Sequence, residues 1–495
     1  MGKIIKQSIQ GSIWSYLGLV VGYINVGIIM PNFFRADQIG LVQIFIAITT
    51  IFSNFSSLGF GSVINRMFPE FRDKEKSHNG FMFILVFTGL VGFILSSMAF
   101  FILKPHIIDA NAEKSPLLVE YIVLLLPLVF FRIFFRLLDQ YNRVLQDAVT
   151  GAFWNDFIHK TINLVLVVSF SFDLITFNQF FYGYLISLSI PIIPIIIVHA
   201  RRSEFDLRPN FKFLKPPMVR EMFIVSAFGM VNGLSGALTN NIDKLMINRF
   251  LSLEQVGIFS VCALFATIIY IPSRSTVKIS TGIIAQAWKD NKPEKIQDIY
   301  KKASLTQTIL GVLIYSGIVV NLGSVFTILP EQYATGKWVL LLYSFGMLFR
   351  VSNTTGGSII ATSKRYRVLS YFIVLQILYT VIFHFLFIPK WGITGAAIAV
   401  LMTYFVRSLI VVSYLKLKMG FFCYSFKHII VLIFAAVAVF LVTLIPDTDI
   451  LVLNIFIKSS LVTLLFMSIM VGLNISDEIT GLVRKGFDSI MSKIR

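Results

Sequence analysis

Residues 32–41 read NFFRADQIGL, and residues 249–258 read RFLSLEQVGI, 217 positions later. Three of the ten pairs are identical and four more are chemically similar. An acid followed by Gln, an aliphatic residue and Gly suits a helix start, because an acid favours the amino end of a helix and Gly permits close packing. That explanation accounts for one copy more easily than for two. The pattern therefore predicts an internal repeat.

Long apolar runs surround both copies. Of 495 residues, 56% are hydrophobic and only 14% are charged, a composition far from that of soluble globular proteins. The apolar residues form runs of roughly twenty, the length needed to cross about 30 Å of hydrocarbon. The sequence therefore predicts an all-α polytopic membrane protein of about fourteen transmembrane helices. The predicted spans are 11–31, 39–64, 80–103, 118–138, 152–171, 176–199, 221–248, 256–283, 303–329, 337–360, 368–388, 392–415, 427–445 and 451–473.

The formal charge of +18 follows the predicted topology. With a cytoplasmic amino terminus, alternate loops carry 30 Lys and Arg residues and the opposite loops carry six. This bias is the positive-inside pattern, so both termini are predicted to be cytoplasmic. The charge thus indicates orientation rather than nucleic-acid binding. Cys262 and Cys423 lie far apart without metal-ligand spacing, so neither a metal nor a cofactor is predicted.

The repeat also predicts the domain organisation. Both motif copies precede spans that run in the same direction, so the halves are parallel repeats, an arrangement common in transporters. A weaker echo, FFR at 130–132 and LFR at 348–350, extends the match. The predicted parts are an N-terminal six-helix lobe (1–200), a cytoplasmic inter-lobe linker (201–220), a C-terminal six-helix lobe (221–415), an extra helical pair (416–473) and a basic amphipathic cytoplasmic tail (474–495).

Two spans at matched positions lose their apolar character in the second half. Residues 53–62 and residues 272–282 are rich in Ser, Thr, Gly, Asn and Pro. Interrupted helices at corresponding places in two repeats are typical of transporter binding sites. Small residues also serve tight helix packing, and the sequence leaves both interpretations open.

Seven Lys and Arg residues fall at membrane depth. A charge at the bilayer centre costs at least about 2.5 kcal/mol, so such side chains should face protein or a water-filled cavity. Arg274 and Lys278 share one helix face without an acidic partner on it, and Arg350 precedes a polar break. These three are predicted to line a cationic cavity. The seven are Lys160, Lys244, Arg274, Lys278, Arg350, Arg407 and Lys458, of which Arg407 and Lys458 could instead snorkel toward the interface.

Acidic and amide residues accompany two of these cations. Asp156 precedes Lys160 by one helical turn, which suits a local ion pair or a coupling element. The span over 221–248 carries a polar stripe that a lipid-facing helix would not tolerate, and its Lys244 is a further cavity candidate. The candidates for coupling or gating are Asp243, Asp156, Lys160, Asn25, Asn240 and Asn241.

A cavity with more cations than acids attracts an anion, and Arg in particular forks onto phosphate oxygens. The cationic positions therefore predict a phosphate-bearing substrate.

Several short motifs resemble those of polysaccharide-biosynthesis flippases, the Wzx-like oligosaccharide flippases of the multidrug/oligosaccharidyl-lipid/polysaccharide (MOP) exporter superfamily. The motifs are GSIWSY at 11–16, PNFF at 31–34, DQIG at 37–40, LGFG at 58–61 and NRMFP at 65–69. The resemblance, which runs through twelve spans, implies two six-helix lobes around a cation-lined cavity that opens alternately to either face. It implies that Arg66, Arg274 and Lys278 face a pyrophosphate. This chain departs from relatives of the lipid II flippase in having no arginine in its first span.

The predicted function is a flippase, not an enzyme. It would move a polyprenyl-pyrophosphate-linked oligosaccharide, such as an O-antigen, capsule or exopolysaccharide unit, from the inner to the outer leaflet of the bacterial inner membrane. Membrane lipids and glycan polymerase machinery would be further partners.

Two other functions compete with this prediction. A cation-coupled multidrug efflux antiporter of the same superfamily would need acids in its N-terminal lobe, and Asn25 stands where an Asp would be wanted. A membrane-embedded glycan-processing enzyme would show a large external loop or a His motif such as HxxxxD, and the sequence has neither.

Overall fold

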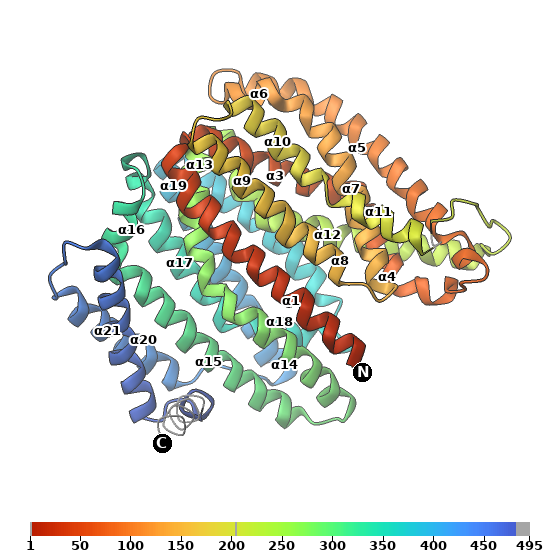
Figure 1. Ribbon diagram of the computed structural model, residues 1–495. Helices are drawn as coiled ribbons and strands as arrows, with labels where there is room; N and C mark the ends of the chain where they lie inside the picture. Colours follow the sequence, from red (N-terminus) through yellow and green to blue (C-terminus); the bar gives the residue numbers. More distant parts are fainter. Residues whose placement is uncertain (1, 203–204, 482–495) are drawn as a thin grey trace. The chain divides into compact units, whose positions relative to one another are not determined.

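The computed structural model describes residues 2–202 and 205–481, and every regular element in these ranges is a helix (Figure 1). Eleven segments are long and apolar enough to cross a membrane. All fourteen predicted spans fall on helices, but the count of fourteen is not confirmed. One of the eleven segments, Val368–Met419, contains two predicted spans. The predicted spans 152–171 and 337–360 are not among the eleven segments. The chain is thus an all-helical, multi-pass membrane protein.

The chain divides into two compact units, Met1–Val261 and Cys262–Arg495. The helices up to the boundary are α1 (Gly2–Tyr23), η1 (Ile24–Ile29), α2 (Met30–Phe33), α3 (Ala36–Ser56), α4 (Phe60–Phe71), η2 (Ser77–Gly80), α5 (Phe81–Asn111), α6 (Pro116–Tyr121), η3 (Ile122–Leu124), α7 (Leu125–Val144), α8 (Val149–Gly151), η4 (Ala152–Ile158), α9 (His159–Ser171), α10 (Phe177–Ser189), α11 (Ile192–Arg201) and α12 (Pro216–Phe250). Helix α13 (Leu253–Thr267) crosses the boundary.

The remaining helices belong to the second unit. They are η5 (Ile268–Tyr270), α14 (Ile271–Lys289), α15 (Pro293–Val320), α16 (Leu322–Ile328), η6 (Glu331–Gly336), α17 (Lys337–Ser352), α18 (Thr354–Ala361), α19 (Val368–Tyr414), η7 (Leu415–Met419), α20 (Phe426–Thr443) and α21 (Leu451–Gly472). Helix α19 joins two predicted spans across a kink at Trp391 and Gly392, where Gly392 adopts a φ of +57°. A positive φ is accessible to Gly without steric cost, which explains how the chain reverses here.

The core of the first unit is built on aromatic side chains. Helix α4 places apolar residues at positions 60, 63, 64, 67, 68 and 71, the spacing of one buried helix face, and all six are buried. The rings of Phe68 and Phe71 lie 5.3 and 4.9 Å from that of Phe81 on α5, and Phe68 lies 5.2 Å from Tyr141 on α7. Such pairs add about 0.5–1.5 kcal/mol each beyond area burial. The cluster therefore joins α4, α5 and α7.

The two copies of the repeat motif meet inside the first unit. A Cβ atom added to Gly40 on α3 would lie 1.8 Å from the carbonyl oxygen of Leu253, and one added to Gly257 on α13 would lie 2.0 Å from that of Ala36. Positions 36 and 40 correspond to 253 and 257 in the repeat, so the crossing is reciprocal. This contact supports the predicted repeat and explains why both copies need Gly.

Helix α12 packs against α3 and α4 within the first unit, although the predicted repeat assigns it to the C-terminal lobe. The boundary between the compact units, after Val261, therefore lies later in the sequence than the predicted boundary between the lobes. The lobe boundaries at 200 and 221 stay predictions, since a repeat boundary and a boundary of contact density are different properties.

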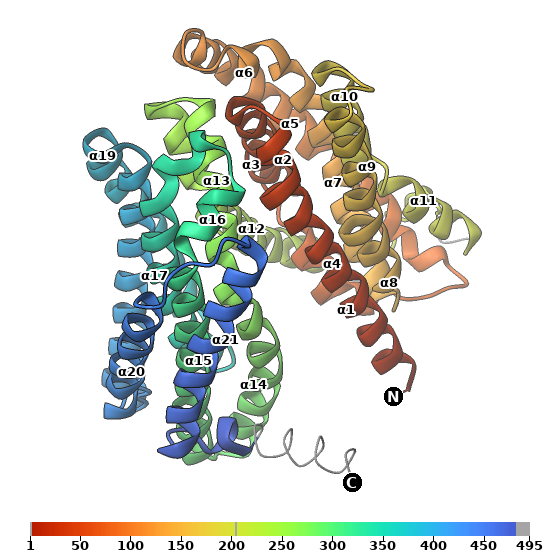
Figure 2. The same ribbon diagram turned by 60° about the vertical axis from the view of Figure 1, so that its left-hand side comes forward.

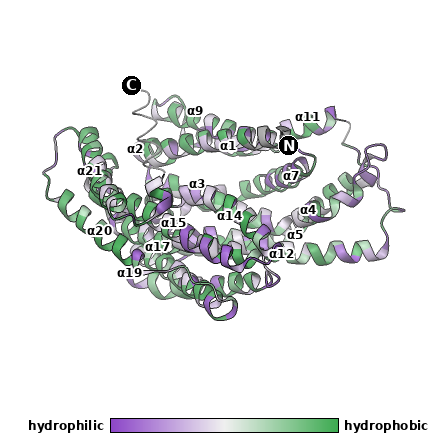
Figure 3. Cartoon of the chain, turned by 90° about the horizontal axis from the view of Figure 1, so that it is seen from below, coloured by the Kyte–Doolittle hydropathy of each residue, from purple (hydrophilic) through white to green (hydrophobic). Residues whose placement is uncertain are grey.

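The extra helical pair corresponds to α20 and α21, which pack against each other and against α15 (Figure 2). Figure 3 shows both helices as mostly hydrophobic, and Phe466 and Val431 share a buried cluster with Ile309 of α15. The cluster extends to Ile479. The rest of the predicted tail, 482–495, lies outside the described residues.

Candidate substrate-binding site

Arg350 of α17 is the centre of an aromatic and cationic cluster in the second unit. Its guanidinium carbon lies 4.2 Å from the ring centroid of Tyr270 and 5.3 Å from that of Tyr404. Arg350 Nη1 also donates a hydrogen bond of 3.0 Å to the Tyr404 hydroxyl. In the described part of the chain no carboxylate pairs with Arg350. Cation–π contacts hold the side chain in place without cancelling its charge.

A second arginine reaches the same ring. The Arg274 guanidinium of α14 lies 5.9 Å from the Tyr270 centroid. Lys278 follows one turn later, and both side chains are exposed. The structure thus brings Arg274 and Arg350 to the ring of Tyr270, and Lys278 lies on the helix that carries Arg274.

Arg407 of α19 adds a fourth cation to the second unit. Its Nη1 donates to the side-chain oxygen of Gln376, which lies on the other arm of α19, before the kink. An amide cannot neutralise a guanidinium, and among described residues Arg407 has no carboxylate partner. Together, Arg274, Lys278, Arg350 and Arg407 are named the C-terminal cation cluster.

The first unit holds two arginines that belong to the 30 Lys and Arg residues counted in the predicted loops, although they lie within the predicted span 118–138. Arg132 and Arg136 lie inside α7, within the candidate span Pro116–Val144. This placement corrects the loop assignment. The two arginines and Gln140 recur every four residues, a polar stripe along an otherwise apolar helix that could have revealed them.

Arg132 begins a chain of hydrogen bonds that ends at an acid. Its Nη1 donates to Asn155 Oδ1 at 2.9 Å, and Asn155 Nδ2 donates to Asp156 Oδ1 at 2.8 Å. Ser15 of α1 donates to the other Asp156 oxygen at 2.6 Å. Asn155 and Asp156 belong to the π-helix η4, and π-helical turns are frequent at functional sites. Asp156 thus accepts hydrogen bonds from Ser15 and Asn155, and its coupling role stays a prediction.

The other coupling candidates in the first unit have mixed surroundings. Lys160 packs against α1, where a Cβ on Gly22 would lie 3.5 Å from its Cδ, and its predicted pairing with Asp156 stays a prediction. Asn25 is buried in the π-helix η1, and its amide oxygen has no hydrogen-bond partner among the described residues. A buried polar atom without a hydrogen bond costs about 1–3 kcal/mol. The coupling or gating role of Asn25 stays a prediction.

The polar stripe of α12 is largely satisfied within the unit. The Asn240 and Asn241 amides donate to the carbonyls of Gly236 and Ala237, at 2.9 Å each. Lys244 Nζ donates to Gln43 of α3 at 2.9 Å, and the buried Asp243 accepts from the Lys244 backbone N–H. These contacts favour a helix-packing role, and the gating role of the stripe stays a prediction.

Arg66 differs from the other cation candidates because an acid shares its charge. Its Nη2 lies 3.0 Å from a carboxylate oxygen of Glu221 on α12. Both side chains are largely exposed, so the pair contributes little to stability. A pyrophosphate would have to compete with Glu221 for this guanidinium.

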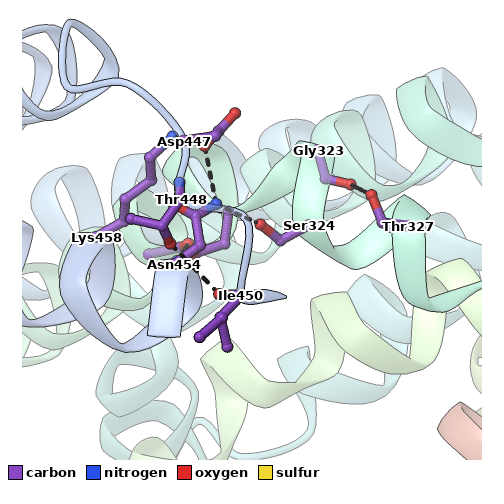
Figure 4. Close-up of polar contacts among 10 residues, drawn as sticks. Gly323, Ser324, Thr327, Asp447, Thr448, Ile450, Asn454 and Lys458 are labelled. Atoms are coloured by element: carbon purple, nitrogen blue, oxygen red, sulfur yellow. Dashed lines mark hydrogen bonds and ion pairs between the residues drawn. The ribbon is translucent and has the colours of Figure 1, made fainter. Parts of the chain in front are cut away.

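Lys458 of α21 belongs to a separate polar cluster (Figure 4). Its ammonium pairs with Asp447 in the loop before α21, while Asn454 donates to Asp447 at 2.8 Å and to Ser324 of α16 at 3.0 Å. The side chain of Lys458 is 9% exposed and that of Asp447 is 72% exposed. This ion pair holds the loop between α20 and α21 against α21, which is a structural role.

Asp447→Asn is expected to lower the melting temperature of the purified protein, because it leaves the buried Lys458 ammonium without its counter-charge. Adding Lys458→Met should restore most of the loss. The hydrogen bonds from Lys458 and Asn454 hold the pKa of Asp447 below its ordinary value. The difference in melting temperature between wild type and Asp447→Asn should therefore be complete above about pH 4. It should disappear as the pH falls through the lowered pKa of Asp447. Equal melting temperatures of wild type and Asp447→Asn at neutral pH would contradict this structural role of the ion pair.

Comparison with known proteins identifies the family of the chain. Residues 9–277, more than half of the chain, match the family described as "Polysaccharide biosynthesis protein". The chain belongs to the polysaccharide biosynthesis protein family. The matched region contains residues 9–261 of the first unit and, from the second, Arg274.

The chain is also similar to individual proteins. It is 24% identical to the capsular polysaccharide biosynthesis protein CapF of Staphylococcus aureus over 189 residues, which cover 38% of this chain and 48% of CapF. The match thus spans about half of that relative.

Several solved structures are similar to this chain in fold. The lipid II flippase MurJ in an inward closed conformation matches with a TM-score of 0.74 and 14% identity, over 94% of this chain and 98% of MurJ. An inward-facing multidrug resistance MATE family transporter of the MOP superfamily matches with a TM-score of 0.60 and 15% identity, over 83% and 98%. The chain therefore has the fold of MOP transporters, as the sequence motifs predicted.

Proposed function

We propose that this protein translocates a polyprenyl-pyrophosphate-linked oligosaccharide from the inner to the outer leaflet of the bacterial inner membrane. The observation that carries the proposal is the C-terminal cation cluster, in which aromatic and amide groups contact arginines that no described carboxylate neutralises. A pyrophosphate offers the charge that such a cluster lacks, and Arg binds phosphate oxygens in a forked geometry. Membership of a polysaccharide biosynthesis family supports a glycan as the cargo.

The proposed mechanism is alternating access, as in transporters built from parallel repeats. The cations of each unit bind the pyrophosphate at a stage of transport, Arg132 and Arg136 in the first unit and the C-terminal cation cluster in the second. Asp156 is proposed as the coupling acid, because its two oxygens link α1 to η4. Both termini are proposed to be cytoplasmic, and a glycan polymerase is proposed to receive the exported unit.

Deletion of the gene in its host tests this function. Lipid-linked oligosaccharide is expected to accumulate on the cytoplasmic leaflet, where externally added glycosidase cannot reach it, and surface glycan should fall. Re-expression of the wild-type chain should restore both. A surface glycan and a leaflet distribution equal to those of the parent strain would contradict the proposal.

A multidrug antiporter is the second candidate, favoured by the half-buried acid Asp156 and by the MATE-like fold. Expression in an efflux-deficient host discriminates the two functions. The flippase proposal predicts unchanged resistance to cationic drugs, whereas an antiporter would raise resistance in a manner that Asp156→Asn abolishes.

A further inference from the structure

A groove in the first unit runs between α5 and α12. Its volume is about 580 Å³, within the range of about 300–1,000 Å³ that ligand sites occupy. The walls are almost entirely apolar, and two of the lining side chains, Phe87 and Phe223, are 56% and 73% exposed. The lining includes Phe83, Phe87 and Val91 of α5 and Phe223, Ala227 and Met230 of α12.

The length of the groove along α12 is close to the hydrocarbon thickness of one leaflet. On α12 it extends from Val219 to Met230, a distance of about 16 Å at 1.5 Å per helical residue. Half of a hydrocarbon core of about 30 Å is about 15 Å. A single acyl chain of a phospholipid therefore matches its length, whereas a long polyprenyl chain would extend well beyond it.

The segment before α12 folds back over the mouth of the groove. The Phe211 ring lies 6.0 Å from Phe83, and the Phe213 ring lies 5.0 Å from Phe71. Gly80 makes the approach possible, since a Cβ there would lie 2.8 Å from the backbone nitrogen of Asn210. Lys212 lies between these two anchored residues in the sequence, next to Phe211, which lines the groove.

The mouth carries positive charge that no described acid offsets. Lys212, Lys215 and Arg220 are exposed, and in residues 2–202 and 205–481 none of them pairs with a carboxylate. Nearby Glu221 is engaged by Arg66, and Asp206 lies near Arg208. Basic residues at the end of a groove between membrane helices suit an anionic lipid head group.

We propose that this groove binds an anionic phospholipid of the inner leaflet, with one acyl chain between α5 and α12 and the phosphate at Lys212 and Lys215. The bound lipid completes the packing of the segment 205–215 against α5. This site does not depend on the proposed transport function, because it shares no residue with either cation cluster.

Native mass spectrometry of the purified full chain tests the site, with phosphatidylglycerol and phosphatidylcholine of identical acyl chains as probes. Wild type should retain phosphatidylglycerol about tenfold more tightly. Lys212→Gln with Lys215→Gln should remove most of this preference and leave phosphatidylcholine retention unchanged. Lys289→Gln with Lys292→Gln, an exposed pair in another loop, is the matched control and should behave as wild type.

A second variant probes the groove itself. Ala227→Trp fills the wall from α12 and should weaken both lipids to a similar extent, with gel-filtration profiles confirming the fold. If it does not fold, the lysine pair decides alone. Equal phosphatidylglycerol retention by the two lysine-pair variants would overturn the proposal. Displacement of phosphatidylglycerol from wild type by one equivalent of polyprenyl phosphate would also overturn it, since the groove would then hold the carrier lipid.

Discussion

Replacing Arg274, Lys278 and Arg350 together by glutamine is expected to reduce export of the surface glycan at least about 100-fold at normal protein levels. A hydrogen bond to a charged group contributes about 1.5–3 kcal/mol, and each 1.4 kcal/mol is a factor of ten in binding. Loss of three such contacts therefore removes most of the affinity for a pyrophosphate. Surface glycan staining together with membrane protein levels measures the effect.

The matched control removes the same charge from another place. Lys289 ends α14, Lys292 lies in the α14–α15 connection and Lys295 lies in the first turn of α15, and all three are exposed. Their combined change to glutamine should leave export near the wild-type level. Export that survives neutralisation of Arg274, Lys278 and Arg350 would remove the cavity assignment. Equal losses in both triple variants would show that overall charge, rather than the cation cluster, matters.

Gly257→Ala is expected to destabilise the protein by about 3 kcal/mol or more, an effect typical of severe overpacking. The new methyl group would lie 2.0 Å from the Ala36 carbonyl oxygen, which is backbone and cannot rotate away. Gly40→Ala should behave alike, because its methyl group would meet the Leu253 carbonyl at 1.8 Å. Thermal unfolding in detergent and the folded yield measure the loss.

Gly236 provides the control for this pair. It lies in α12 of the same unit, and nothing is within 4 Å of an added Cβ. Gly236→Ala should be neutral or stabilising by up to about 1 kcal/mol, since Ala is the better helix former. Wild-type stability of Gly257→Ala would show that α3 and α13 do not cross closely at the repeat motif.

The repeat and the apolar runs made the fold predictable from the sequence. The reciprocal contact of Gly40 and Gly257 follows from two motif copies that each need Gly, and run length alone placed every predicted span on a helix. The number of spans was less certain, because the kinked helix α19 joins two runs and the π-helix η4 interrupts another.

The candidate site was only partly predictable. Arg274, Lys278 and Arg350 stand out because each is a charge in an apolar run without a local acid. The partner of Arg66, Glu221, lies 155 residues away, and no local pattern reveals such a pair. Arg132 and Arg136 were missed because they lie near the end of an apolar run, where a loop and a helix continuation have the same composition.

The most direct test of the flippase proposal is leaflet accessibility of a lipid-linked oligosaccharide in vesicles that contain only the purified chain. The substrate is placed in one leaflet, and a membrane-impermeant glycosidase is added outside. The proposal predicts that wild-type vesicles expose substrate from the inner leaflet over time, while vesicles with the Arg274, Lys278 and Arg350 triple variant do not. Equal protection of the inner-leaflet substrate in wild-type, variant and protein-free vesicles would contradict it.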